Sequence, residues 1–198
     1  MAVGNTFVAG VFAIATATTG VLSTLFLVVF FAGVQAFGPL NDAFIGITAI
    51  LAAILAGFLT VADRSGGSFT KAMLIAAATA GAIVVAAGSI LVMSRTTGFL
   101  LSGLYMAFGN ALIGLWLLSW GLINKAQLSA TPRLQAFGVI TGAFMVIGLV
   151  AIIGMIKRAD DWESLPRYVA YLAGVGAIGW IGVFPVWSAI LGVRLVSR

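Results

Sequence analysis

The stretch at residues 98–124 limits what this chain can fold into, because it is almost entirely apolar and contains no charged side chain. A helix crosses the hydrocarbon core of a bilayer with about 20 such residues. Only 8% of the whole chain is charged and 62% is hydrophobic, whereas soluble domains carry about 25% charged residues. The chain is therefore predicted to be an integral membrane protein.

Apolar stretches of similar length recur along the sequence and predict an all-α, polytopic membrane protein with six transmembrane helices. We expect one transmembrane domain over residues 1–198, with spans at about 6–34, 43–62, 71–93, 98–124, 132–156 and 166–193. The first apolar run is too long for the core of a signal peptide, which has roughly 7–15 residues. We therefore expect it to be an uncleaved first span in contact with the lipid bilayer.

The fourth predicted span carries small residues at three- and four-residue spacing, which places them on one stripe of a helix. The stripe consists of Gly103, Ala107, Asn110, Gly114 and Gly121. Small residues let two helices approach closely in a membrane, and Asn110 is the only carboxamide deep inside a predicted span. We expect Asn110, Gly103, Ala107 and Gly114 to contact either another helix or a solute.

Two further candidates for helix packing or solute contact lie in other spans. Thr16 belongs to a hydroxyl-rich section of the first span. Its side chain is expected to bond to a carbonyl one turn earlier, with a polar pore lining as the alternative. Pro185 is expected to kink the sixth span, because the carbonyl of Ile181 loses its N–H partner. The alanine-rich third span is small on two faces, so we expect other helices to surround it.

The connections between spans carry helix-start signals. Asn41 or Asp42 is expected to cap the second helix, because its side-chain oxygen accepts a free backbone N–H. An ion site at Asp42 is the alternative. Thr131 followed by Pro132 predicts the start of the fifth helix.

Charge is most concentrated in the loop at about 157–167. Asp160 and Glu163 have the spacing of a capping box there, which predicts a short interfacial helix.

Basic residues stand singly at the ends of the spans, and their distribution predicts the orientation. One side has Arg64, Lys71, Lys125, Arg133, Arg194 and Arg198, and the other has Arg95, Lys157, Arg158 and Arg167. The bias favours both termini in the cytoplasm. Because the basic residues follow this pattern, we do not expect nucleic acid as a partner.

The halves 1–94 and 95–198 show signs of an internal repeat. The stretches 39–49 and 132–142 share Pro, Ala-Phe and Ile-Thr at matching positions. Three-helix units in tandem would be inverted in the membrane. A chain rich in Ala and Gly also produces such matches by coincidence, so both interpretations stay open. The same register equates two glycine pairs: Gly10 with Gly103, and Gly81 with Gly174.

The chain contains no cysteine and no histidine. Thiol catalysis, disulfides, His-ligated haem and His-based metal sites are therefore excluded, and we expect no cofactor and no metal. The stretch 174–179 reads GVGAIG, but it lies inside an apolar span. The dinucleotide fingerprint follows a strand, so these glycines are expected to serve helix packing.

Five short motifs are spread over most of the chain: GPLND at 38–42, GNALIGLW at 109–116, PRLQ at 132–135, PVW at 185–187 and LGVRL at 191–195. Together with Gly138 they resemble an uncharacterised group of bacterial multi-pass membrane proteins, the type classed as domain of unknown function 4386. The resemblance implies a six-helix protein of the bacterial inner membrane. It brings no catalytic or binding residues with it.

An enzyme is not expected, because the spans hold no nucleophile with a base and no carboxylate or lysine at mid-depth. A transporter or channel for a small neutral solute or lipid would suit the repeat, the proline in the sixth span and the hydroxyls of the first span. We favour a helical scaffold or accessory subunit that packs against other membrane subunits or itself, because small-residue faces occur on nearly every span.

Overall fold

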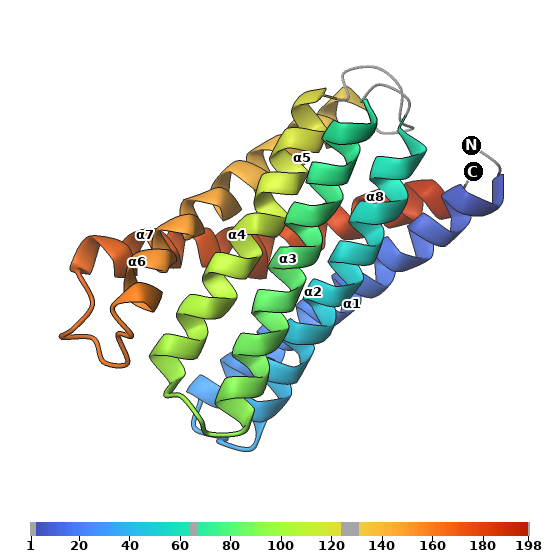
Figure 1. The fold of residues 1–198 in the computed structure, drawn as a ribbon. Coiled ribbons are helices and arrows are strands. Elements are labelled where there is room, and N and C mark those ends of the chain that lie inside the picture. Colours follow the sequence, from blue (N-terminus) through green and yellow to red (C-terminus); the bar gives the residue numbers. More distant parts are fainter. Residues whose placement is uncertain (1–2, 64–66, 124–130, 198) are drawn as a thin grey trace.

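The computed structural model describes residues 3–63, 67–123 and 131–197, and within these ranges it contains helices and no strands. Six helical spans are long and apolar enough to cross a membrane, so the chain is a multi-pass integral membrane protein (Figure 1). The first four spans are single helices: α1 (Val3–Phe31), α2 (Phe37–Ala62), α3 (Ser68–Met93) and α4 (Phe99–Ile123).

The last two spans change helix type along their length. The fifth consists of α5 (Pro132–Val146), the 3₁₀ turn η1 (Ile147–Val150) and α6 (Ala151–Ile156). The sixth consists of α7 (Arg167–Ile178), the π-helical turn η2 (Gly179–Val183) and α8 (Phe184–Val196). The expected spans are therefore confirmed, with boundaries that differ by a few residues.

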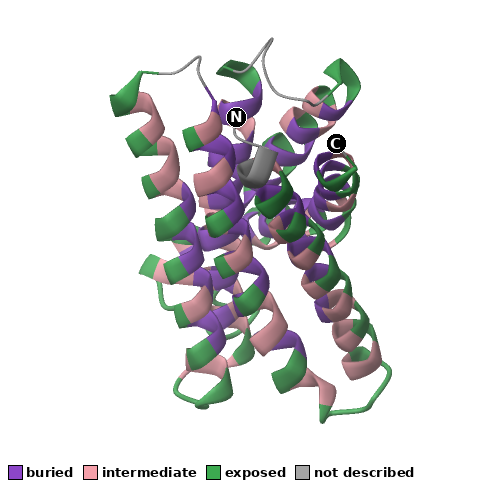
Figure 2. Ribbon diagram, turned by 90° about the vertical axis from the view of Figure 1, so that its right-hand side faces the viewer, coloured by how far each residue is buried: buried purple, intermediate pink, exposed green. Residues whose placement is uncertain are grey.

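The spans pack in sequence order and close on themselves. Each of α1 to α4 packs against the next helix, α7 packs against η1 and α5, and α8 packs along α1. Figure 2 shows the buried residues on the sides of the helices that face one another. This ring is compatible with two inverted halves, because exchanging the halves maps the α3–α4 contact onto the α8–α1 contact.

The glycines that the predicted repeat places at equivalent positions do not have equivalent surroundings in the structure. Gly10 packs against α8 and Gly81 packs against α4, whereas a Cβ added at Gly103 or at Gly174 would meet no atom within 4 Å. Equivalent glycines would have equivalent neighbours. The internal repeat therefore stays a prediction.

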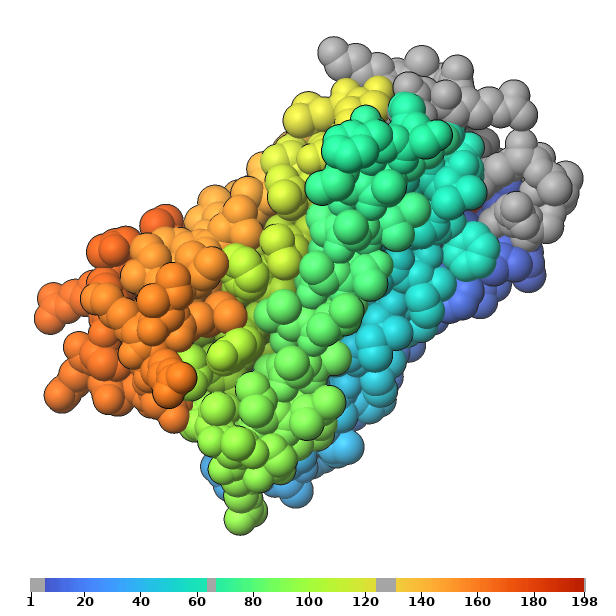
Figure 3. Space-filling view, in the orientation of Figure 1, coloured from blue at the N-terminus to red at the C-terminus, as the bar shows by residue number. Residues whose placement is uncertain are grey.

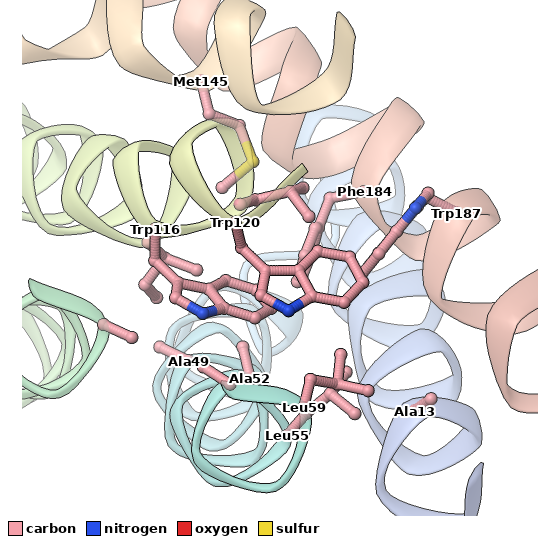
Figure 4. Packing of buried hydrophobic residues seen from close by; sticks show 14 of the residues in the cluster. Ala13, Ala49, Ala52, Leu55, Leu59, Trp116, Trp120, Met145, Phe184 and Trp187 are labelled. Carbon is pink, nitrogen blue, oxygen red and sulfur yellow. The ribbon is translucent and has the colours of Figure 1, made fainter. Parts of the chain in front are cut away.

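Aromatic side chains of α4 and α8 lie together in the hydrophobic core, beside leucines and alanines of other helices (Figure 4). The rings of Trp116 and Trp120 stack with centroids 6.0 Å apart, and Trp187 meets both edge-on. The indole N–H of Trp116 donates to Thr60 Oγ1 over 2.9 Å, and that of Trp187 donates to the Leu134 carbonyl over 3.3 Å. These bonds satisfy polar atoms that would be costly in an apolar core.

Helices cross most closely where two glycines meet. A Cβ added to Gly81 would lie 2.5 Å from the carbonyl oxygen of Gly109, and one added to Gly109 would lie 2.6 Å from that of Gly81. Such spacing leaves room only for hydrogen on either residue. Gly114 and Gly142 approach each other in the same way, and a Cβ added to Gly176 or to Gly192 would meet the backbone of Gly148 or of Gly10.

The start of α2 differs from the expectation. The helix begins at Phe37, so Asn41 and Asp42 lie inside it and do not cap it; the N-cap residue is Ala36, without a side-chain hydrogen bond. Pro39 is tolerated because the N–H groups of a first turn have no intrahelical partner. The cap prediction was therefore wrong. The fifth helix begins at Pro132 after Thr131, as expected.

The expected interfacial helix at Asp160 and Glu163 is absent from the described loop, which forms turns between α6 and α7. The Asp160 carboxylate instead accepts the backbone N–H of Gly98 over 2.8 Å and that of Leu101 over 3.3 Å. These N–H groups belong to the start of α4, where the helix dipole favours a negative charge.

The neighbouring carboxylate closes a turn inside the loop. Asp161 accepts the backbone N–H of Ser164 over 2.7 Å. This hydrogen bond lowers the pKa of Asp161 from its usual value, because it stabilises the charged form.

The alanine-rich α3 is not surrounded by helices of this chain. It lies between α2 and α4, as Figure 3 shows on the face turned to the reader. Ala72, Ala76, Ala80 and Ala87 are exposed on its outer side. Other helices of this chain therefore cover only part of the two small-residue faces that the sequence indicated on α3.

Candidate functional site

A cavity of about 200 Å³ lies between helices of the bundle. We call it the Asn110 cavity. Its wall combines residues of α1, α2, α4, α7 and η2. Its polar lining residues are Asn41, Asp42, Ser102 and Asn110, and its aromatic ones are Phe99 and Trp180.

The structure divides the six candidate residues from the sequence into two groups. Asn110, Gly103 and Ala107 line the Asn110 cavity. Gly114, Thr16 and Pro185 are not among its lining residues, and Gly114 and Pro185 contact neighbouring helices. The stripe on α4 therefore has two roles: its first half borders a cavity, and its second half packs against α5.

Asn110 faces the interior of the bundle and not lipid, as its place on the stripe predicts. Its side chain is 7% exposed, and its Oδ1 has no hydrogen-bond partner within the part of the chain that the structure describes. An unpaired amide in hydrocarbon costs several kcal/mol. A buried polar atom without a partner requires an explanation, and a ligand or a water in the cavity would supply one here.

A second polar group enters the cavity from α2. Ser23 Oγ donates to Asn41 Oδ1 over 2.9 Å, and Asn41 Nδ2 donates to Asp42 Oδ1 over 3.1 Å. All three side chains are at least nine-tenths buried. The chain of bonds fixes the Asp42 carboxylate at the wall of the cavity.

The two polar groups lie at different depths. Asp42 is five residues after the start of α2 and Asn110 is eleven after the start of α4, which corresponds to about 8 and 16 Å along the helix axes. Both helices start on the same side of the bundle (Figure 1). The hydrocarbon core is about 30 Å thick, so the cavity extends from near the headgroups toward the midplane.

Small residues of α4 and α7 create space beside the cavity. Gly103 and Gly174 have no neighbour within 4 Å of an added Cβ, which is the reverse of the close glycine contacts elsewhere in the ring. A second pocket of about 190 Å³ lies against the same two helices. It shares Phe99, Gly103, Ala107 and Ala177 with the Asn110 cavity.

Thr16 and Gly114 serve packing. Thr16 is fully buried and donates to the carbonyl of Phe12 over 2.7 Å, so the expected bond to the preceding turn is confirmed and the pore lining is not. Gly114 meets Gly142 and Met145 of α5. Neither residue contacts the Asn110 cavity.

Pro185 follows a π-helical turn, which accommodates its missing N–H. The carbonyl of Ile181, one turn earlier, accepts a hydrogen bond from Thr24 Oγ1 of α1 over 3.2 Å. The proline ring itself packs on Gly20. The turn η2 also brings Trp180 into the cavity wall, and single π-turns of this kind are frequent at functional sites.

Stacked rings of the sixth span join the cavity wall to the aromatic core. Trp180 stacks on Phe184 with centroids 5.1 Å apart, and Phe184 stacks on Trp187 at 5.8 Å. The apolar wall is therefore rigid on this side. No lysine or arginine belongs to the lining residues.

Sequence reasoning did not assign Asn41, Ser102 and Trp180 to a site, and it treated Asp42 mainly as a cap. The sequence did contain a signal for Asn41 and Asp42. These two adjacent polar residues precede a long apolar run, and no basic residue stands beside them. No sequence signal indicated Trp180, because the side on which its ring lies depends on the π-turn η2.

No protein-family model, curated protein or solved structure matches this chain.

Proposed function

We propose that this multi-pass membrane protein binds a small solute or a lipid in the Asn110 cavity and acts as a carrier or transporter. The observation that carries the proposal is the buried carboxamide of Asn110, which lines a cavity while its Oδ1 has no partner among the described residues. Ligand sites are mostly apolar with a few polar groups that fix orientation. The lining of the Asn110 cavity has this composition.

A scaffold or accessory subunit is the second candidate. The close glycine contacts join helices of one chain, so they account for its fold without a partner. One observation still favours this role: Ala72, Ala76 and Ala80 recur at four-residue spacing on the exposed side of α3, and such rows let a helix of another subunit approach.

We further propose that the protein is not an enzyme, because the chain has neither histidine nor cysteine for the usual nucleophile and base pairs. We place it in the bacterial inner membrane, among the proteins of the domain of unknown function 4386 type that its motifs resemble. Both termini would be cytoplasmic. The support for this orientation is the bias of basic residues, of which Arg64, Lys125 and Arg198 lie outside the described residues.

Filling the cavity tests the proposal. Ala107→Trp places a large ring in the cavity, whereas Ala80→Trp adds the same ring to the exposed side of α3. Protein released from lipid nanodiscs would be examined by native mass spectrometry for retained small molecules. We expect wild type and Ala80→Trp to retain a molecule that Ala107→Trp lacks.

The proposal fails if all three proteins give the same spectrum. Loss of the molecule in Ala80→Trp, with retention in Ala107→Trp, would instead support binding at the outer surface and the scaffold.

A further inference from the structure

The charge of the Asn110 cavity indicates the class of its ligand. We propose that the cavity takes an amphiphilic amine, a small apolar molecule with one protonated amino group, and that Asp42 binds the ammonium. This inference rests on the proposed function, because it names the ligand of the same cavity.

Asp42 supplies the negative charge without a protein cation to balance it. The side chain is 7% exposed, and the lining residues of the cavity include no lysine or arginine. Within the described chain, the only hydrogen bond to its carboxylate comes from Asn41. A carboxylate buried in a membrane protein is costly unless a cation pairs with it.

The hydroxyl donors near Asp42 are used inside the protein, and so is one of the two N–H groups of the Asn41 carboxamide. Asn41 Nδ2 donates to Asp42, Ser23 Oγ donates to Asn41, and Ser102 Oγ donates to the carbonyls of Gly98 and Phe99. The cavity therefore presents acceptors near the headgroup depth. An ammonium group brings three donors and a positive charge, which matches this need.

Asn110 and Trp180 receive the remainder of such a molecule. The Asn110 carboxamide offers an acceptor and a donor deeper in the cavity, and it can turn to present either. The Trp180 ring stacks on Phe184 and lines the wall, where it offers an apolar surface and a π face to a cation. A cavity near 150 Å³ holds a benzene ring, so about 200 Å³ fits a phenyl ring with a short amine chain.

A neutral ligand is the competing class, because an uncharged Asp42 would donate a hydrogen bond to a hydroxyl or a carbonyl. The two classes differ in how binding depends on the head group. Phenethylamine, 2-phenylethanol and phenylacetate share one apolar body and carry an ammonium, a hydroxyl and a carboxylate, so they separate the classes directly.

The experiment measures the dissociation constants of these three compounds by equilibrium dialysis against the full chain in lipid nanodiscs, with empty nanodiscs as the blank. At about pH 7 the amine is protonated. We expect the order amine, alcohol, carboxylate from tightest to weakest. Asp42→Asn should weaken amine binding about tenfold or more and leave alcohol binding unchanged. Asp42→Glu should keep the preference for the amine.

Asp161→Asn removes a carboxylate from the exposed loop and serves as the matched control, with affinities equal to wild type. The inference is overturned if wild type binds the alcohol as tightly as the amine, or if Asp42→Asn keeps the preference for the amine. If only the alcohol binds, the proposal of an amine ligand is overturned and the proposed function still holds. Binding of none of the three overturns the amine proposal, whereas the proposed function is decided by the retained molecule in the mass spectrum. If Asp42→Asn does not fold, the ranking in wild type decides.

Discussion

The side-chain nitrogen of Asn41 lies 3.1 Å from Oδ1 of Asp42 and donates to it inside the membrane-spanning bundle. Asn41 itself accepts from Ser23 of α1. The pair therefore fastens α2 to α1 while it holds a carboxylate at the cavity wall. The two buried asparagines therefore differ in hydrogen bonding. Both side-chain groups of Asn41 have partners, whereas Oδ1 of Asn110 has none among the described residues.

Asn41→Ala should destabilise the protein. The substitution removes the side-chain acceptor of Ser23 Oγ, which keeps only the backbone carbonyl of residue 41 at 3.5 Å. It also removes the donor to Asp42, and each unsatisfied buried group costs about 1–3 kcal/mol. Thermal unfolding in detergent measures the effect. Gln35→Ala, in the exposed turn before α2, is the control and should match wild type. Equal midpoints for Asn41→Ala and wild type would contradict the role assigned to this pair.

Asn110→Leu should leave stability unchanged or raise it. The carboxamide oxygen makes no hydrogen bond within the described chain, so an apolar side chain of similar size loses no bond and avoids an unpaired polar group. The same unfolding assay applies, and ligand binding should fall. A clear decrease in the unfolding midpoint would show that Asn110 supports packing and not the cavity.

Gly109→Ala should force α3 and α4 apart. Its Cβ would lie 2.6 Å from the Gly81 carbonyl and 2.8 Å from the Val85 nitrogen, and such overpacking costs about 1–3 kcal/mol. Gly57→Ala is the matched control, because nothing lies within 4 Å of its Cβ and alanine favours a helix by about 0.5–1 kcal/mol. We expect opposite shifts in the unfolding midpoint; a stabilising Gly109→Ala would refute the close contact.

Reporter fusions should confirm the orientation. A fusion after Lys125, which lies outside the described residues, should report the cytoplasm, and one after Arg158 should report the opposite side. The expectation follows from an even number of spans and the bias of basic residues. If both fusions report the same side, the topology is wrong.

The spans could be predicted from sequence because hydrophobic length alone decides whether a helix crosses a bilayer. Thr131 and Pro132 marked a helix start for an equally local reason. The start of α2 was missed, because Pro39 fits a first turn as readily as it precedes one. Asp160 was assigned to a local cap, since nothing in sequence reveals that the start of α4 lies beside it.

The cavity was beyond sequence reasoning for a different reason. Gly103 and Gly114 occupy one stripe of α4, yet the first borders open space and the second meets Gly142. The inclination of neighbouring helices decides between these outcomes. The 3₁₀ turn in the fifth span and the π-turn that precedes Pro185 were also not predicted, because the proline indicated a kink and not a change of helix type.

Cysteine accessibility tests the central claim, that the Asn110 cavity receives small molecules, most directly. The chain has no cysteine of its own, so Ala107→Cys in the cavity wall and Ala111→Cys, one turn further along α4 and fully buried, form a matched pair. Intact membranes would be treated with a small water-soluble thiol reagent, with and without phenethylamine. We expect labelling at Ala107→Cys that the amine slows, and no labelling at Ala111→Cys. No labelling at Ala107→Cys, or equal labelling at both positions, would contradict it.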